Sequence, residues 1–257
     1  FPYLTECLIP KSRFPRLSEI LKFLQVGYNG EKCYKQGGSM QIGKIKRIVD
    51  IGMLLGMLLL MAFSVTEAAA HEWIGIGETI LVVVHQILNR KWYGALGKGR
   101  YSGLRIFSTV VTLLLFVAFA GTAFSGMSMS GEAVPFLYGI GHLSDPQRLH
   151  LSLAHWSFVL MGIHVGLHVP AIVGQKSFTT RIKPGIAVIL AMLPCYGLYR
   201  FIENDMVRYL LFQSHFAMVD FEKPGALVLV ENLLMLLPWI FVGIEATLLF
   251  RRKKEMQ

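Results

Sequence analysis

Six apolar stretches dominate this chain of 257 residues, and most are long enough to cross a bilayer as a helix. Hydrophobic residues make up 54% of the chain and charged residues only 16%, whereas soluble domains carry about 25% charged residues. The sequence therefore predicts an all-α membrane protein with six transmembrane helices. The fifth stretch is the shortest and contains Pro194 and Gly197. The expected spans are 45–65, 68–88, 104–127, 149–173, 185–202 and 226–250.

Basic residues gather in alternate connections between these stretches. They precede the first span at 44–47 and recur at 90–105, 176–183 and 251–254, so that six alternating helices bring them all to one side. The positive-inside rule then places both termini in the cytoplasm of a multi-pass protein surrounded by membrane lipid. The net charge of +9 is explained in this way, and no basic, aromatic-rich module indicates a nucleic-acid partner.

Two pairs of histidines repeat one spacing. His71 and His85 lie 14 residues apart in the second span, and His150 and His164 lie 14 residues apart in the fourth. In an α-helix this spacing brings two side chains to within about 40° of one face, roughly 21 Å apart along the axis. The second and fourth spans run in the same direction, so we expect His71 to face His150 and His85 to face His164.

Facing imidazoles on neighbouring helices are typical of haem sites with two axial histidines. The sequence thus predicts two haem b groups, with iron bound by His71 and His150 and by His85 and His164, in a four-helix dihaem core like that of cytochrome b. Covalent c-type haem is not expected, because the three cysteines of the chain are scattered and no Cys-x-x-Cys-His motif is present.

The remaining histidines are open to several readings. His168 follows His164 by one turn and could replace it as ligand, contact a haem propionate or line a quinone pocket, so it is kept as a cofactor-binding candidate. His155 is interpreted as polar packing. His142 and His215 are expected in extracytoplasmic loops, with His215 a candidate proton acceptor at a quinol site.

One carboxyl group and four glycines accompany the histidine pairs. Glu78 lies seven residues from each histidine of its span and is expected on the haem-facing side, where it would tune the haem, relay a proton or bond to a neighbouring helix. Gly75, Gly77, Gly162 and Gly166 lie near the ligands, where small residues would leave room for a porphyrin or allow close helix contact.

The chain divides into three parts on this reading. Residues 1–39 contain no spanning stretch, and Met40 follows a Gln-Gly-Gly-Ser sequence. We expect this segment to be translated upstream sequence, disordered, or a short cytoplasmic extension. Residues 40–175 form the haem-binding domain, and residues 176–257 add two transmembrane helices and a basic tail.

Several short motifs resemble the flavinylation-associated membrane b-type cytochromes of bacteria, a family formerly described as a domain of unknown function. The motifs lie at 71–75, 84–93, 148–150, 155–168, 196–199 and 215–222. The resemblance implies a cytochrome of the bacterial cytoplasmic membrane that passes electrons between the quinone pool and extracytoplasmic flavoproteins carrying covalent FMN. It also implies that His71, His85, His150 and His164 are the haem ligands.

Two other functions remain open. A transporter of a cation or proton would use intramembrane His and Glu side chains, which explains Glu78 and His168 but not the repeated spacing. A membrane anchor could retain haem for structure alone. The protein is expected to be an electron-transfer component without catalytic residues of its own, and whether it is a quinol-oxidising subunit stays open.

Overall fold

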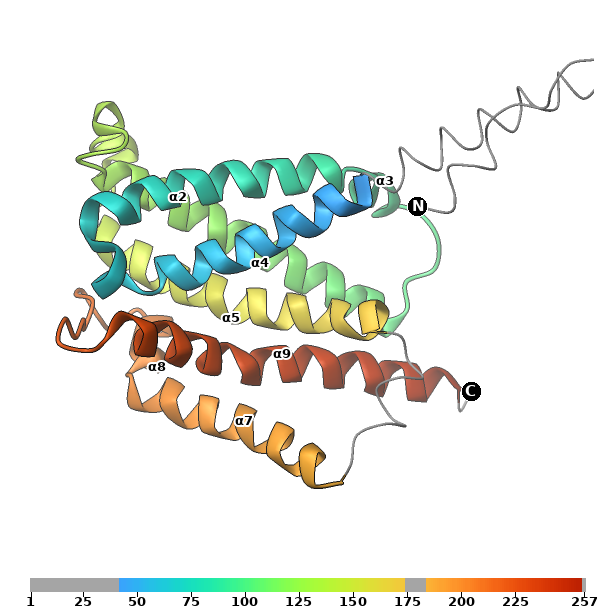
Figure 1. Cartoon of the computed structure of the whole chain (residues 1–257). Coiled ribbons are helices and arrows are strands. Elements are labelled where there is room, and N and C mark those ends of the chain that lie inside the picture. Colours follow the sequence, from blue (N-terminus) through green and yellow to red (C-terminus); the bar gives the residue numbers. More distant parts are fainter. Residues whose placement is uncertain (1–41, 174–183, 256–257) are drawn as a thin grey trace, which may run out of the picture. The chain divides into compact units, whose positions relative to one another are not determined.

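The computed structural model describes residues 42–173 and 184–255 (Figure 1). The expected segment 1–39 and the basic connection 176–183 lie outside the described residues. The chain divides into two units, residues 1–51 and 52–257. Of the first unit the structure describes only the helical residues 42–51, and the following description concerns the second unit.

All regular secondary structure of the described residues is helical, which confirms the all-α class. One helix covers 42–60, and the other long helices are α2 (Phe63–Leu88), α4 (Gly103–Met129), α5 (Pro146–Val173), α7 (Pro184–Glu203) and α9 (Gly225–Glu255). Short helices lie in the connections: α3 (Lys91–Ala95), η1 (Pro135–Leu137), η2 (Ile140–His142) and α8 (Met206–Leu210).

Three helices in the described part of the chain are long and apolar enough to cross a membrane, namely Gly103–Met129, Pro146–Pro170 and Gly225–Arg252. These helices indicate a membrane protein. The helix α2 is equally long but carries Glu67, Glu72 and Glu78 besides two histidines, and these side chains lower its hydropathy.

The first expected span ends too late in the sequence prediction. The helix that was expected to reach residue 65 stops at residue 60, and the chain reverses before α2. Glu67 marks this turn with a left-handed backbone, φ 54° and ψ −176°. The prediction was wrong here because apolar residues continue through the turn, so hydrophobicity alone did not reveal the helix end.

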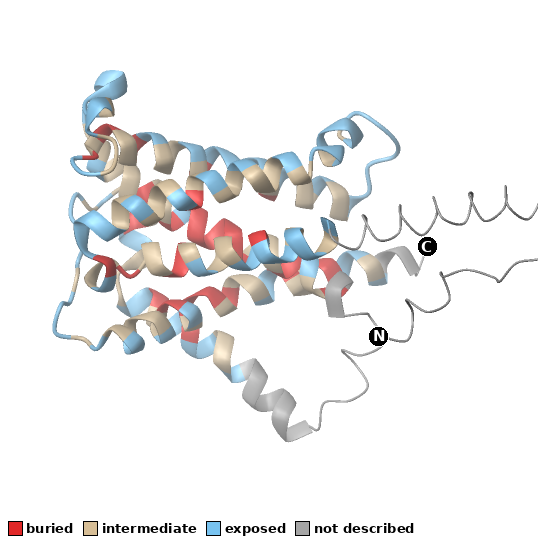
Figure 2. Ribbon diagram, turned by 45° about the horizontal axis from the view of Figure 1, so that its top comes forward, coloured by how far each residue is buried: buried red, intermediate tan, exposed pale blue. Residues whose placement is uncertain are grey.

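The helix α5 lies between α4 and α9, and α7 packs against α9 (Figures 1 and 2). Gly162 and Gly166 belong to the contact with α9: a Cβ on Gly162 would lie 2.7 Å from Trp239 Cβ, and one on Gly166 would collide with the Ile240 carbonyl. Gly243 of α9 is equally close to the backbone of α5. The expectation that Gly162 and Gly166 make room for a porphyrin is therefore wrong; they allow two helices to approach closely.

The connections between helices segregate to two ends. At one end, the rings of Phe107 and Phe250 lie 6.2 Å apart, so the basic 90–105 connection meets the basic end of α9. At the other end, the Arg148 side chain donates a hydrogen bond to the Phe212 carbonyl. This places the basic connections of the described chain together, as alternating helices require.

Candidate functional site

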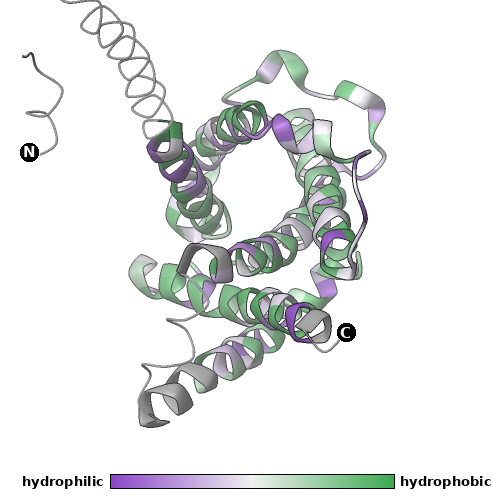
Figure 3. Cartoon of the chain, turned by 90° about the vertical axis from the view of Figure 1, so that its right-hand side faces the viewer, coloured by the Kyte–Doolittle hydropathy of each residue, from purple (hydrophilic) through white to green (hydrophobic). Residues whose placement is uncertain are grey.

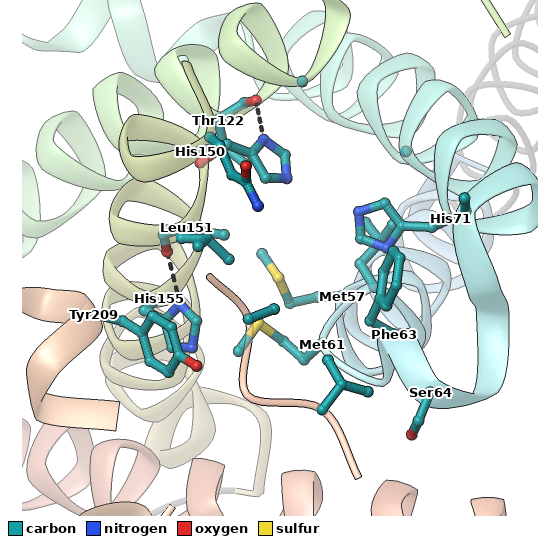
Figure 4. Close-up of a pocket in the computed structure, with 18 of the residues that line it drawn as sticks. Met57, Met61, Phe63, Ser64, His71, Thr122, His150, Leu151, His155 and Tyr209 are labelled. Atoms are coloured by element: carbon teal, nitrogen blue, oxygen red, sulfur yellow. Dashed lines mark hydrogen bonds between the residues drawn. The ribbon is translucent and has the colours of Figure 1, made fainter. Parts of the chain in front are cut away.

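A cavity of about 680 Å³ lies in the helical unit, within the size range of cofactor pockets. Its walls come from α2, α4 and α5, from residues 57–61 and from parts of the 204–235 region. Seen along the helices in Figure 3, α2, α4 and α5 form three sides of a ring. His71 of α2 and His150 of α5 project into the cavity from opposite walls (Figure 4).

The two imidazoles are spaced as two axial ligands would be. Their ring centroids lie 6.1 Å apart and their planes are inclined by 71°. A metal ion bound at about 2 Å by one nitrogen of each ring requires a centroid separation of about 6 Å. The expected neighbourhood of His71 and His150 is thus present, and the gap between them has the width of one coordinated metal.

Neighbouring groups orient the His150 ring. Its Nδ1 lies 2.9 Å from the Thr122 carbonyl oxygen, which fixes the N–H on Nδ1 and leaves Nε2 as the lone-pair nitrogen. Metal-binding histidines commonly donate their second ring N–H to a carbonyl in this way. A Cβ on Gly126 would lie 3.0 Å from His150 Cε1, so the glycine leaves room for the ring. The sequence analysis missed Gly126, which lies on a different helix from either histidine.

His71 offers a nitrogen to the cavity region without a competing partner. Its Nδ1 is buried and has no hydrogen-bond partner among the residues that the structure describes. The ring of Phe63 lies edge-on to the imidazole at 5.3 Å. A buried polar atom left unpaired is unfavourable, and coordination of a cofactor at this ring would remove that penalty.

Glu72, beside His71, ties α2 to the segment after α4. Its carboxylate accepts hydrogen bonds from Ser130 Oγ at 2.7 Å and from the backbone N–H groups of Glu132 and Ala133, both at 2.9 Å. A fourth comes from the Gly131 N–H at 3.2 Å. These bonds hold the His71 end of α2 in place. Sequence reasoning did not identify this role, because the partners lie 58 to 61 residues away.

The second predicted pair lies two to three turns further along each helix. His164 Nδ1 lies 3.2 Å from Thr112 Oγ1, and the ring is close enough to His85 for the two to interact electrostatically. Asn89 Nδ2 lies 3.4 Å from both ring nitrogens of His85. The structure therefore brings His85 and His164 into the same region.

His168 also reaches this region. Its ring centroid lies 4.8 Å from that of His164, in an edge-on arrangement. His164 is partly buried and contacts Thr112, whereas His168 is exposed. These surroundings favour His164 as a ligand and His168 as its neighbour.

His155 has a defined place in the cavity wall. The ring is buried, its Nδ1 lies 2.6 Å from the Leu151 carbonyl oxygen, and it stacks on Tyr209 at 4.2 Å (Figure 4). Its role in polar packing thus agrees with the sequence interpretation, and it additionally faces the cavity.

The two remaining histidines lie in connections. His215 forms an ion pair at 2.9 Å with Asp145, and His142 is exposed at the end of η2.

Methionines are concentrated around the cavity. Of the 12 methionines of the chain, seven line it: Met57, Met61, Met127, Met129, Met206, Met218 and Met235. Flexible, polarisable thioethers adapt to a large flat ring and make favourable contacts with aromatic systems. This clustering was not anticipated, since the residues come from four separate segments.

Glu78 does not line the cavity with the histidines, contrary to the expectation that it faces the haem. Its side chain is only 3% exposed and lies against Gly56 of the 42–60 helix. Within the described ranges, no group of three or more His, Cys, Asp or Glu side chains converges as a metal site. Comparison with family models, curated proteins and solved structures finds no match to this chain.

Proposed function

We propose that this protein is a six-span transmembrane b-type cytochrome with two haems, one between His71 and His150 and one between His85 and His164. It passes electrons between quinol and an extracytoplasmic flavin-bearing protein across a bacterial cytoplasmic membrane. The observation that carries the proposal is the 6.1 Å separation of the His71 and His150 rings across a cavity of cofactor size.

The residues of the first site fit a haem. His71 and His150 would supply the axial nitrogens, and haem iron when bound supplies one-electron chemistry. The Thr122 carbonyl holds the His150 tautomer, and Glu72 holds α2 against the 130–133 segment. The methionine-rich wall would surround the ring and exclude water. The protein thus supplies position and environment, which determine the reduction potential.

The second site has a similar but less enclosed set of residues. Thr112 contacts His164 Nδ1 as the Thr122 carbonyl contacts His150 Nδ1. The two pairs are separated by 14 residues on each helix, roughly 21 Å along the axis. Haems at these positions would form a relay across the membrane, with the second near the basic connections that we assign to the cytoplasm.

The test is a reduced-minus-oxidised visible spectrum of the purified protein, combined with pyridine haemochrome quantification. We expect a b-type spectrum and about two haems per chain. Reduction by a quinol, followed by reoxidation by an FMN-bearing partner, tests the direction and the acceptor. A protein that contains no haem after expression in a haem-replete host contradicts the proposal.

The alternative is a cation or proton transporter, which the buried carboxyl of Glu78 favours. It does not account for the matched histidine pairs. Uptake of a labelled cation by vesicles containing a haem-free protein would distinguish it from a cytochrome.

A further inference from the structure

A buried carboxyl group lies midway along α2, outside the cavity that holds the first histidine pair. Glu78 is 3% exposed, and its Oε2 atom has no hydrogen-bond partner in the part of the chain that the structure describes. An ionised carboxylate in such a place is strongly unfavourable unless it is paired. This location therefore favours a group that can bind a proton.

The facing helix has a glycine opposite this carboxyl. A Cβ added to Gly56 would collide with Glu78 Oε2, and it would lie only 3.1 Å from the carboxyl carbon. Any larger residue at position 56 would displace the carboxyl group. Gly56 and Glu78 are thus sterically matched, and the carboxyl has a defined place between two helices.

The position of Glu78 relates it to both proposed haems. It lies seven residues from His71 and seven from His85, about 10 Å from each along the helix axis. Within a low-dielectric interior, a change of one unit of charge is felt over such distances. A negative charge added at either site would favour protonation of Glu78.

Few other titratable groups lie near this position. The facing stretch 52–60 contains none, and the two turns of α2 on either side contain only His71, Glu72 and His85. The helices α4 and α9 also contact α2. The only charged residue of α4 is Arg105 in its first turn, and α9 carries Glu231, Glu245 and its basic end.

We propose that Glu78 takes up a proton when an electron enters the dihaem core and releases it when the electron leaves, an inference that rests on the proposed function. One electron from the quinol-class donor is added to the core, and one proton from water binds to a carboxylate oxygen of Glu78. The only bond formed is the O–H bond, and it breaks on oxidation. Electron transfer through this chain is thereby coupled to proton uptake.

Redox titration of the haem-loaded protein at several pH values tests the coupling. For the wild type we expect the midpoint potential of at least one haem to fall by up to about 59 mV per pH unit, the value for one proton per electron. In Glu78→Gln the slope should be lost or clearly reduced. Glu245→Gln, the same change in another long apolar helix, should retain the wild-type slope. An unchanged slope in Glu78→Gln, or a wild type without a slope, overturns the proposal.

Infrared spectroscopy gives a readout that does not require haem. The C=O stretching band of a protonated carboxyl group should grow as the pH falls in the wild type and should be absent from the corresponding difference spectrum of Glu78→Gln. If the protein binds no haem, the proposed function fails, while this titration still decides whether Glu78 exchanges a proton. Wild-type and Glu78→Gln spectra that coincide throughout the pH range in which the protein stays folded overturn the inference.

Discussion

The imidazole rings of His71 and His150 face each other across one cavity with their centroids 6.1 Å apart, although 78 residues separate them in the chain. Their helices make few direct contacts, so the space between the rings is held open by the surrounding helices and connections. A gap of this width between two nitrogen ligands is the geometric basis of the proposed haem site. The predictions below test what maintains the gap.

Replacement of His150 by alanine should remove one haem and retain the other. Each iron would depend on its own pair of imidazoles, and the His85–His164 region lies several turns away. We expect the pyridine haemochrome value to fall from about two haems per chain to about one, with His85→Ala having the complementary effect. Loss of both haems from a correctly folded His150→Ala protein would show that the sites are not independent.

His142→Ala is the matched control for these variants. His142 is exposed at the end of η2 and makes no contact that the proposed sites use. Its replacement should leave the haem spectrum and stoichiometry unchanged. A missing haem in this variant would mean that the ligands were assigned incorrectly.

The repeated 14-residue spacing predicted the positions of the histidines well, because helix periodicity converts spacing directly into a shared face. His71 lies beside His150, and His85 lies near His164, as this reasoning expects. Haem binding itself stays a prediction. The helix class was likewise predictable from apolar composition.

Features that depend on packing between distant segments were not predictable. The glycines Gly162 and Gly166 lie near ligands in the sequence but point to α9, and only the fold reveals which neighbour a helix face meets. Glu72 binds a segment about 60 residues away, and no local pattern signals that contact. The turn before α2 is apolar, so it resembles the helix that it ends.

Gly126→Ala should weaken the site at His150. The new methyl group would lie 3.0 Å from Cε1 and 3.2 Å from Nδ1, so the ring must move away from the Thr122 carbonyl. We expect lower occupancy of one haem and a loss of stability of about 1–3 kcal/mol, as for other overpacked sites. Haem content and thermal unfolding in detergent measure the two effects.

Gly77→Ala provides the comparison, because no described atom outside its own helix backbone lies within 4 Å of a Cβ at that position. It should retain both haems, and its stability should stay equal to or slightly above that of the wild type, since alanine favours helix. Equal behaviour of the two alanine variants would argue against a close fit between Gly126 and His150.

Glu72→Ala should loosen the His71 end of α2. The substitution removes a carboxylate that accepts four hydrogen bonds, and it leaves three backbone N–H groups without this partner. Because the 130–133 segment is partly solvent-exposed, water replaces some of the lost bonds, and we expect a destabilisation of about 1–3 kcal/mol. Hydrogen exchange of the 130–133 amides should accelerate. Unchanged exchange there, with Glu132→Ala as the exposed control, would exclude the proposed role.

Gly166→Ala should destabilise the helix bundle as a whole instead of one site. A Cβ at this position would collide with the Ile240 carbonyl, and Gly243 on α9 is equally close to α5, so the two helices must separate. Separation of closely packed membrane helices weakens the van der Waals contacts that hold them together. We expect a lower unfolding temperature and, under mild conditions, haem loss from both sites in equal proportion. Selective loss of the haem at His164, two residues away, with unchanged unfolding temperature would instead show that Gly166 provides space for the cofactor.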